Sequence, residues 1–144
     1  MDILGEAFQA DPVCRWIVSD PAYPAHLFNL MMTHFVRHGV VMVNKRQNAA
    51  LLAIRPHVTI QYSPSPGDVW RFYCKFGLGA LIRLLRTGRL FDKYHITRPH
   101  YYLFAIGTTN AARGSGEGKK LLSSLTDRAK QEGVAIYAEN SNPA

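Results

Sequence analysis

Residues 113–118 read Arg-Gly-Ser-Gly-Glu-Gly, and this glycine-rich stretch lies between an apolar segment and an amphipathic one. The preceding residues 100–108 (HYYLFAIGT) are rich in aromatic and branched side chains, as expected of a buried strand. One helical face of the following segment carries Gly118, Leu121, Leu122, Leu125 and Ala129. A glycine turn that opens a helix leaves backbone N–H groups unpaired at the positive end of the helix dipole. The order strand, glycine turn, helix therefore predicts a phosphate-binding site.

Three basic residues adjoin this turn. Arg113 precedes the glycines, and Lys119 and Lys120 follow them. Arg113 and Lys119 are expected to contribute positive charge to the phosphate site, whereas Lys120 is expected to be a solvated helix charge. A tight turn without a ligand is the alternative interpretation of the glycines, and the flanking strand and helix favour the phosphate site.

The other elements are predicted from hydrophobic periodicity and from the positions of glycine and proline. Helices are expected at residues 3–10, 25–37, 69–76 and 79–90, and further strands at 40–43, 49–55 and 134–139. Asp11-Pro12 is expected to end the first helix, and Asp68 to cap the one that begins at Val69. The remaining stretches are expected to be a short apolar segment (13–18), a loop (56–67) and a connection (91–99).

The spacing of these elements indicates how the sheet is connected. The polar turn at residues 45–48 joins two strands, which therefore form an antiparallel hairpin. The last strand–helix–strand unit implies a parallel pair with a right-handed crossover. The sequence therefore predicts one mixed α+β domain over residues 1–144. It has a central, mostly antiparallel sheet flanked by helices, with one parallel strand–helix–strand unit.

Composition excludes several classes of protein. The 144 residues suffice for one domain with a core. No apolar stretch approaches the roughly 18–20 residues that span a bilayer, and residues 1–12 lack the features of a signal peptide. Cys14 and Cys74 are sixty positions apart and are expected to be reduced thiols. The histidines show no metal-ligand spacing with Cys, Asp or Glu. We therefore expect a cytoplasmic protein with no membrane partner and no metal.

The chain is basic, with a formal net charge of +7 and a pI near 9.7. Such a charge attracts nucleic acid or a polyanionic small molecule. The basic residues are spread thinly and form no run of five. They are also not interleaved with aromatic residues along one strand, as single-stranded nucleic-acid binding favours. A compact phosphate-bearing ligand is therefore expected, and no nucleic acid, with a basic nucleic-acid-binding module kept as the least favoured alternative.

Several segments together resemble a known family. Residues 113–118 fit the Arg/Gln-x-x-Gly-x-Gly/Ala pattern of the GCN5-related N-acetyltransferases, known as GNAT proteins. The chain also resembles one branch of that family. The segments that carry this resemblance are Ala7–Val13 with Trp16, His100–Leu103, Thr109–Ala112 and Glu139–Pro143. The resemblance extends over most of the chain and implies a GNAT-like fold.

The resemblance implies an acetyl-CoA-dependent N-acetyltransferase that acts on a small-molecule primary amine. It implies that residues 113–119 wrap the pyrophosphate of CoA and that two adjacent strands separate to admit the thioester. It also implies that the strand backbone lines the pantetheine arm. The implied cofactor-binding residues are Ile106, Gly107, Thr108, Arg113, Gly114, Ser115, Gly116, Glu117, Gly118 and Lys119. Asn140 and Asn142 follow the last strand at the mouth of the gap, where a side-chain amide would hydrogen-bond the cofactor, or they are turn formers.

Two departures from the family pattern bear on activity. The family usually has a strand before the first helix, and it usually has a further helix and two strands after the position of Pro143. That helix commonly supplies a tyrosine as general acid. The chain is therefore expected to be a truncated form, and its last strand to present an unpaired edge that favours homo-oligomers. A catalytically impaired CoA-binding remnant is the second functional hypothesis.

Two residues are candidates for acid–base catalysis. Glu139, at the end of the last strand, would act through water as general base for the amine, or would be a structural carboxylate. His100 is a candidate because an imidazole can serve as a base, but its place after a proline at the start of a strand also fits a packing or hydrogen-bonding role. The acetyl group is expected to pass directly from thioester to amine, because neither cysteine is placed as a nucleophile.

Overall fold

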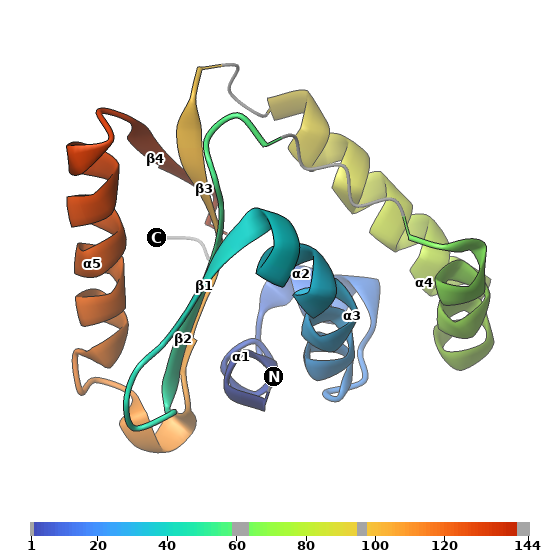
Figure 1. Cartoon of the computed structure of the whole chain (residues 1–144). Coiled ribbons are helices and arrows are strands. Elements are labelled where there is room, and N and C mark those ends of the chain that lie inside the picture. The colour runs from blue at the N-terminus through green and yellow to red at the C-terminus, as the bar shows by residue number, and fades with distance from the viewer. Residues whose placement is uncertain (1, 59–63, 95–97, 141–144) are drawn as a thin grey trace.

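The computed structural model describes residues 2–58, 64–94 and 98–140, with the side chains of residues 91–94 left aside. The elements follow one another along the chain and are drawn in Figure 1. The helices are α1 (Asp2–Ala7), α2 (Pro12–Ile17), α3 (Tyr23–His38), α4 (Pro66–Tyr94), the 3-10 helix η1 (Asn110–Ala112) and α5 (Glu117–Gln131). The strands are β1 (Gly39–Val43), β2 (Ala49–Ile54), β3 (His100–Thr108) and β4 (Ala135–Ala138).

The four strands form one mixed sheet in the order β1-β2-β3-β4. β1 and β2 are an antiparallel hairpin, and β2 pairs with β3 in the same sense, with an irregularity beside Leu52 and Ala53. β3 and β4 are parallel, with His100 opposite Ala135 and Leu103 opposite Ala138. The predicted α+β class, the mostly antiparallel sheet and its single parallel pair are therefore confirmed.

Helices cover both faces of this sheet (Figure 1). On one face α5 packs Leu125 and Ala129 against strand residues that include Leu51 and Tyr101. On the other face α1 and α3 bury Leu4, Phe28 and Phe35 against alternate residues of β2 and β3. β2 is buried along its whole length because it has a neighbour on each edge and a helix layer on each face. The alternation of side chains along the central strands thus separates the two halves of the core.

A third apolar cluster joins α2, α4 and the start of α3. Phe72 and Ala80 of α4 pack with Cys14, Ile17 and Tyr23. Gly77 interrupts α4 with a φ of 81°, a conformation that favours glycine. α4 thus consists of two helical segments joined at this kink, much as the two predicted helices implied, although the second segment continues to Tyr94 instead of ending at 90.

Two helix starts differ from the prediction for the same local reason. Asp11 does not simply end α1, because its carboxylate accepts a hydrogen bond from the Cys14 amide at 2.8 Å and caps α2. The segment 13–18 is therefore mostly helical. Ser65 caps α4, and Asp68 is the reciprocal partner of this capping box, so α4 begins at Pro66 and not at Val69. Both starts carry a polar cap followed by proline, a signal present in the sequence.

The contact between α1 and α3 predicts unequal effects of alanine at two helical glycines. A Cβ on Gly5 would lie 2.6 Å from the Cβ of Ala25 and 2.9 Å from its Cα, whereas nothing lies within 4 Å of a Cβ on Gly88. Gly5→Ala should lower the free energy of unfolding by about 1–3 kcal/mol because α1 must move away. Gly88→Ala should raise it by up to about 1 kcal/mol. Urea unfolding measures both, and equal effects would contradict the close packing of α1 on α3.

Candidate functional site

The glycine turn between β3 and α5 has two residues in the left-handed region. Gly114 has a φ of 81° and Gly116 a φ of 78°, and a Cβ added to either would meet nothing within 4 Å. The turn starts from η1, where the Arg113 amide bonds to the carbonyl of Asn110 at 3.2 Å. The turn is therefore open around its two glycines, and it lies at the start of a fifteen-residue helix.

Most amides of this turn are unpaired. The Ser115 amide bonds to the carbonyl of Ala112, and the first intrahelical bond of α5 runs from Lys120 to Gly116. Within the described residues no hydrogen bond uses the amides of Gly114, Gly116, Glu117, Gly118 and Lys119. Gly116 is the N-cap and has no side chain to satisfy them. The turn thus presents several N–H groups at the positive end of the α5 dipole, as an anion site requires.

Side chains hold this turn against the β1–β2 hairpin. The Asn44 amide donates hydrogen bonds to Glu117 at 2.9 Å and to Asn48 at 2.6 Å, and its oxygen accepts from the amides of Asn48 and Ala49. Lys120 contacts the other Glu117 oxygen at 2.7 Å. These hydrogen bonds from Lys120 and Asn44 lower the pKa of the Glu117 carboxyl. The Glu117 side chain therefore holds the turn in place, and the backbone N–H of Glu117 remains available to a ligand.

The pairing of β3 with β4 ends well before β3 does. The last pair is Leu103 with Ala138, whereas β3 continues to Thr108. Beyond Leu103, β3 is paired with β2 on one edge and with no described β4 residue on the other. The resulting free edge includes Ile106, Gly107 and Thr108 and leads directly to the glycine turn.

Two tyrosine hydroxyls meet one carboxylate where this pairing ends. Tyr102 and Tyr137 are opposite each other in the parallel pair, and their rings stack with centroids 5.9 Å apart. Both hydroxyls donate to Glu139, Tyr137 at 3.0 Å and Tyr102 at 3.3 Å. Burial, followed by the Glu139 charge, raises the pKa of Tyr102 well above its usual range. The hydrogen bond to Glu139 likewise raises the pKa of Tyr137. These hydroxyls therefore stay protonated and orient the carboxylate.

His100 is buried at the opposite end of β3 from the glycine turn. Its Nδ1 lies 2.6 Å from the carbonyl oxygen of Arg98, and its ring meets the Tyr137 ring edge-on at 5.6 Å. A carbonyl oxygen only accepts, so Nδ1 carries a proton. His100 thus contacts the Tyr137 ring of the Glu139 cluster, and its geometry fits a packing role more readily than exchange of protons with a substrate.

Neither thiol lies at this site. Cys14 is buried in the α2–α4 cluster, where burial above all raises its pKa to about 12. Cys74 is exposed on α4. A buried thiol with so high a pKa does not form the thiolate that a nucleophile requires.

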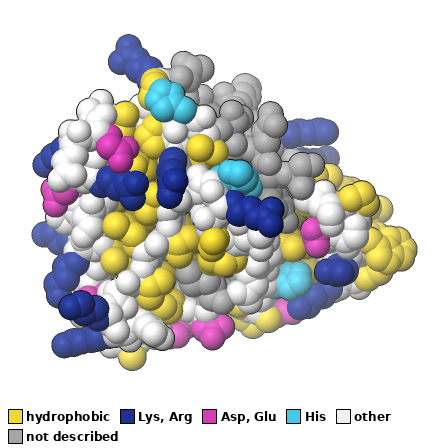
Figure 2. Space-filling view, in the orientation of Figure 1, with side chains coloured by type: hydrophobic (Ala, Val, Ile, Leu, Met, Phe, Trp, Pro, Cys, Tyr) yellow, Lys and Arg dark blue, Asp and Glu magenta, His cyan; other side chains and the backbone are white. Residues whose placement is uncertain are grey.

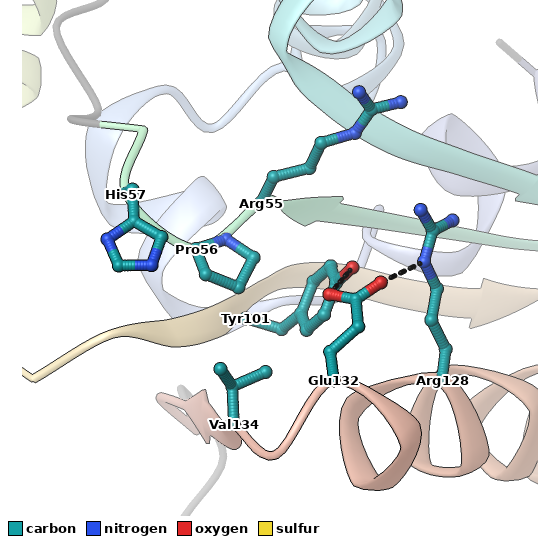
Figure 3. Close-up of a pocket in the computed structure, with 7 residues that line it drawn as sticks. All are labelled: Arg55, Pro56, His57, Tyr101, Arg128, Glu132 and Val134. Carbon is teal, nitrogen blue, oxygen red and sulfur yellow. Dashed lines mark hydrogen bonds and ion pairs between the residues drawn. The ribbon is translucent and has the colours of Figure 1, made fainter.

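A small cavity of about 260 Å³ lies at the other end of α5 (Figure 3). It is lined by Arg55, Pro56, His57, Tyr101, Arg128, Glu132 and Val134. The Tyr101 hydroxyl donates to Glu132 at 2.7 Å, and Arg128 donates to the other carboxylate oxygen at 3.1 Å (Figure 3). Because α5 separates this cavity from the glycine turn by about 22 Å, and its carboxylate is already paired, it is not part of the candidate site.

The structure brings most of the predicted residues together along one path. The path runs from the glycine turn along the free edge of β3 to Glu139, with Asn140 exposed just beyond. Asn142 lies outside the described residues. Asn44, Tyr102 and Tyr137 also contribute to the site, although they were not among the residues predicted from the sequence. Tyr102 and Tyr137 meet at Glu139 because the register of the parallel pair β3–β4 places them opposite each other, and the sequence alone does not give that register.

Comparisons with known proteins bear on the fold and the family of the chain. A model of the acetyltransferase (GNAT) family matches residues 62–144, which is more than half of the chain. The chain is also similar to a crystal structure of "histone acetyltransferase HPA2 and related acetyltransferase" from Corynebacterium glutamicum, with 28% identity and a TM-score of 0.67. That match covers 98% of this chain and 69% of the other. No curated protein matches significantly. The chain therefore belongs to the GNAT family of acetyltransferases.

Proposed function

We propose that the chain binds acetyl-CoA at the glycine turn and transfers the acetyl group directly to a primary amine. The observation that carries this proposal is the set of five unpaired amides at Gly114 and residues 116–119. Membership of an acetyltransferase family supports acyl transfer in general. Acetyl-CoA as the donor, a primary amine as the acceptor and the roles of individual residues are parts of our proposal.

The turn fits a pyrophosphate better than other groups. Its two left-handed glycines let the backbone approach a ligand without any Cβ in the way. Arg113 and Lys119 are exposed beside it and neither forms an ion pair with another described residue. Their charges would add to the N–H groups in binding a dianion. The free edge of β3 beyond Leu103 offers N–H and C=O groups to the amides of a pantetheine arm, as an edge strand does to an added peptide.

The transfer needs two proton movements. The amine nitrogen forms a bond to the acetyl carbon, the carbon–sulfur bond breaks, the nitrogen releases a proton and the thiolate takes one up. Glu139 is the carboxylate at the end of the strand pair, and we assign it as the acceptor of the amine proton through water. Tyr102 and Tyr137 fix its orientation. Their raised pKa values make them poor acids, so they are positioning residues.

A negative side chain in the turn should weaken CoA binding. Gly116→Asp places a carboxylate at the assigned pyrophosphate and strains a backbone with a φ of 78°. The matched control is Gly133→Asp, because Gly133 also has a positive φ, of 69°, and open space around its Cβ, but lies at the other end of α5. Calorimetry with CoA should show at least about a tenfold higher Kd for Gly116→Asp. Equal Kd values in the two variants would reject the assigned turn.

Removing the Glu139 charge should slow transfer without weakening CoA binding. Glu139→Gln should lower kcat/KM about 100-fold or more, as loss of a general base does. Glu132→Gln is the control, because Glu132 also accepts a tyrosine hydroxyl but lies at the other end of α5. Release of the CoA thiol over a panel of primary amines gives the rates.

Three results of that assay are informative. Loss of activity in Glu139→Gln alone supports the assignment. Wild-type rates in Glu139→Gln would show that another group takes the proton. Tight CoA binding with no turnover for any amine would favour the catalytically impaired, CoA-binding alternative.

A further inference from the structure

One helix carries most of the exposed apolar surface. Of the nine large hydrophobic side chains that are exposed in the described part of the chain, six belong to α4. They range from Tyr73, which is 40% exposed, to Trp70, which is 65% exposed, and comprise Trp70, Tyr73, Leu78, Ile82, Leu85 and Leu90. Single exposed hydrophobic residues are common, but a gathering on one element indicates an interaction surface.

α4 has apolar side chains on two opposite sides. On its inner side, Ala80 and Leu84 pack towards α2, and Thr87 is buried. Leu78, Ile82 and Leu85 follow one another at intervals of four and three residues. At about 100° per residue, they lie on the side of the helix away from Ala80 and its neighbours. The packing within the domain therefore explains the inner side only.

Two further exposed aromatic residues lie on α4 before the kink at Gly77. Trp70 and Tyr73 have ring centroids 5.5 Å apart, and both are exposed. Apolar side chains also gather on the right-hand surface in Figure 2, where Figure 1 shows α4. We call Trp70, Tyr73, Leu78, Ile82 and Leu85 the outer stripe of α4.

The charges around the outer stripe are mostly positive. Residues 66–94 contain six Lys or Arg and two Asp. Arg83 turns inward and donates to the Ile17 carbonyl at 3.0 Å, and Arg71 lies 3.8 Å from Asp68. Lys75, Arg86 and Arg89 are exposed. Two copies of α4 packed through their outer stripes would bring like charges together, so a negatively charged partner is favoured over a second copy.

We propose that the outer stripe of α4 docks on an anionic lipid surface. Trp and Tyr place an apolar ring and a polar group at a membrane interface. Lys and Arg beside them keep their charges at the headgroups while their stems lie along the apolar layer. The net charge of +7 adds long-range attraction to such a surface.

The helix would lie on the membrane and not cross it, since no helix among the described residues is long and apolar enough to span. No membrane partner was expected from the sequence because the chain has no membrane-spanning segment. The outer stripe instead favours binding at the membrane surface, which needs no such segment.

Vesicle sedimentation tests the proposal with the whole chain. Phosphatidylcholine vesicles with phosphatidylglycerol should bind the protein, and those without it should bind it much less. Leu78→Ser/Ile82→Ser/Leu85→Ser should lower the partition coefficient at least about tenfold. The control Val36→Ser/Val43→Ser changes exposed apolar residues on other elements and should bind as the wild type does.

Two further measurements test whether α4 itself, and not only the net charge of the chain, binds the vesicles. Arg86→Glu/Arg89→Glu should lose binding, whereas Arg37→Glu/Lys45→Glu, which changes net charge equally, should lose much less. In Trp16→Phe the only tryptophan is Trp70, and its emission should shift to shorter wavelength on binding.

The following results would overturn the proposal. They are absence of binding to the anionic vesicles, equal binding to both kinds of vesicle, and wild-type binding by the triple serine variant. A stable dimer that the triple serine variant dissociates would likewise overturn it, by assigning the outer stripe to a second copy.

Discussion

The hydrogen bond from Asn44 to Glu117 fixes the start of α5 relative to the sheet. The same Asn44 side chain orders the β1–β2 turn, so the hairpin and the helix start cannot shift independently. Because Glu117 is held by Asn44 and Lys120, its carboxylate does not turn back to cap the amides of its own helix. Glycine as N-cap, in place of Ser or Asp, costs about a few tenths of a kcal/mol. That small loss leaves the amides open to a ligand.

The early end of the β3–β4 pairing is the second feature on which the proposed function depends. A parallel pair that continued to Thr108 would satisfy the β3 edge with another strand. Since pairing stops at Leu103 and Ala138, one edge of β3 between the glycine turn and Glu139 has no described strand partner. The anion site and the carboxylate are thereby joined by a backbone edge, and the stacked tyrosines mark the point where the strands part.

Much of this arrangement was predicted from the sequence because it follows from local patterns. The strand at 100–108, the glycine turn and the helix after it have strong periodicity and an unambiguous breaker, and each appears where expected. The starts of α2 and α4 differ from the prediction because Pro12 and Pro66 were expected to interrupt the chain. In the structure each proline follows a cap, Asp11 or Ser65, and occupies the first turn of a helix. The Asn44–Glu117 bond joins residues 73 positions apart, and no local pattern predicts a polar contact at that separation. The same limit applies to Tyr102 and Tyr137, whose meeting depends on strand register.

The functional path and the outer stripe of α4 are on separate elements. α4 packs through its inner side on α2, while the glycine turn and Glu139 belong to β3, α5 and the end of β4. Variants of the outer stripe should therefore leave CoA binding intact, and variants of the turn should leave lipid binding intact.

The most direct measurement follows the backbone amides themselves. In ¹⁵N–¹H spectra of the chain titrated with CoA, the amide signals of Gly114, Gly116, Glu117, Gly118 and Lys119 should move most, because their N–H groups gain a phosphate acceptor. Saturable shifts confined to these residues and to the adjoining edge of β3 are the predicted result. Unmoved signals for these five amides at saturating CoA would contradict the central claim.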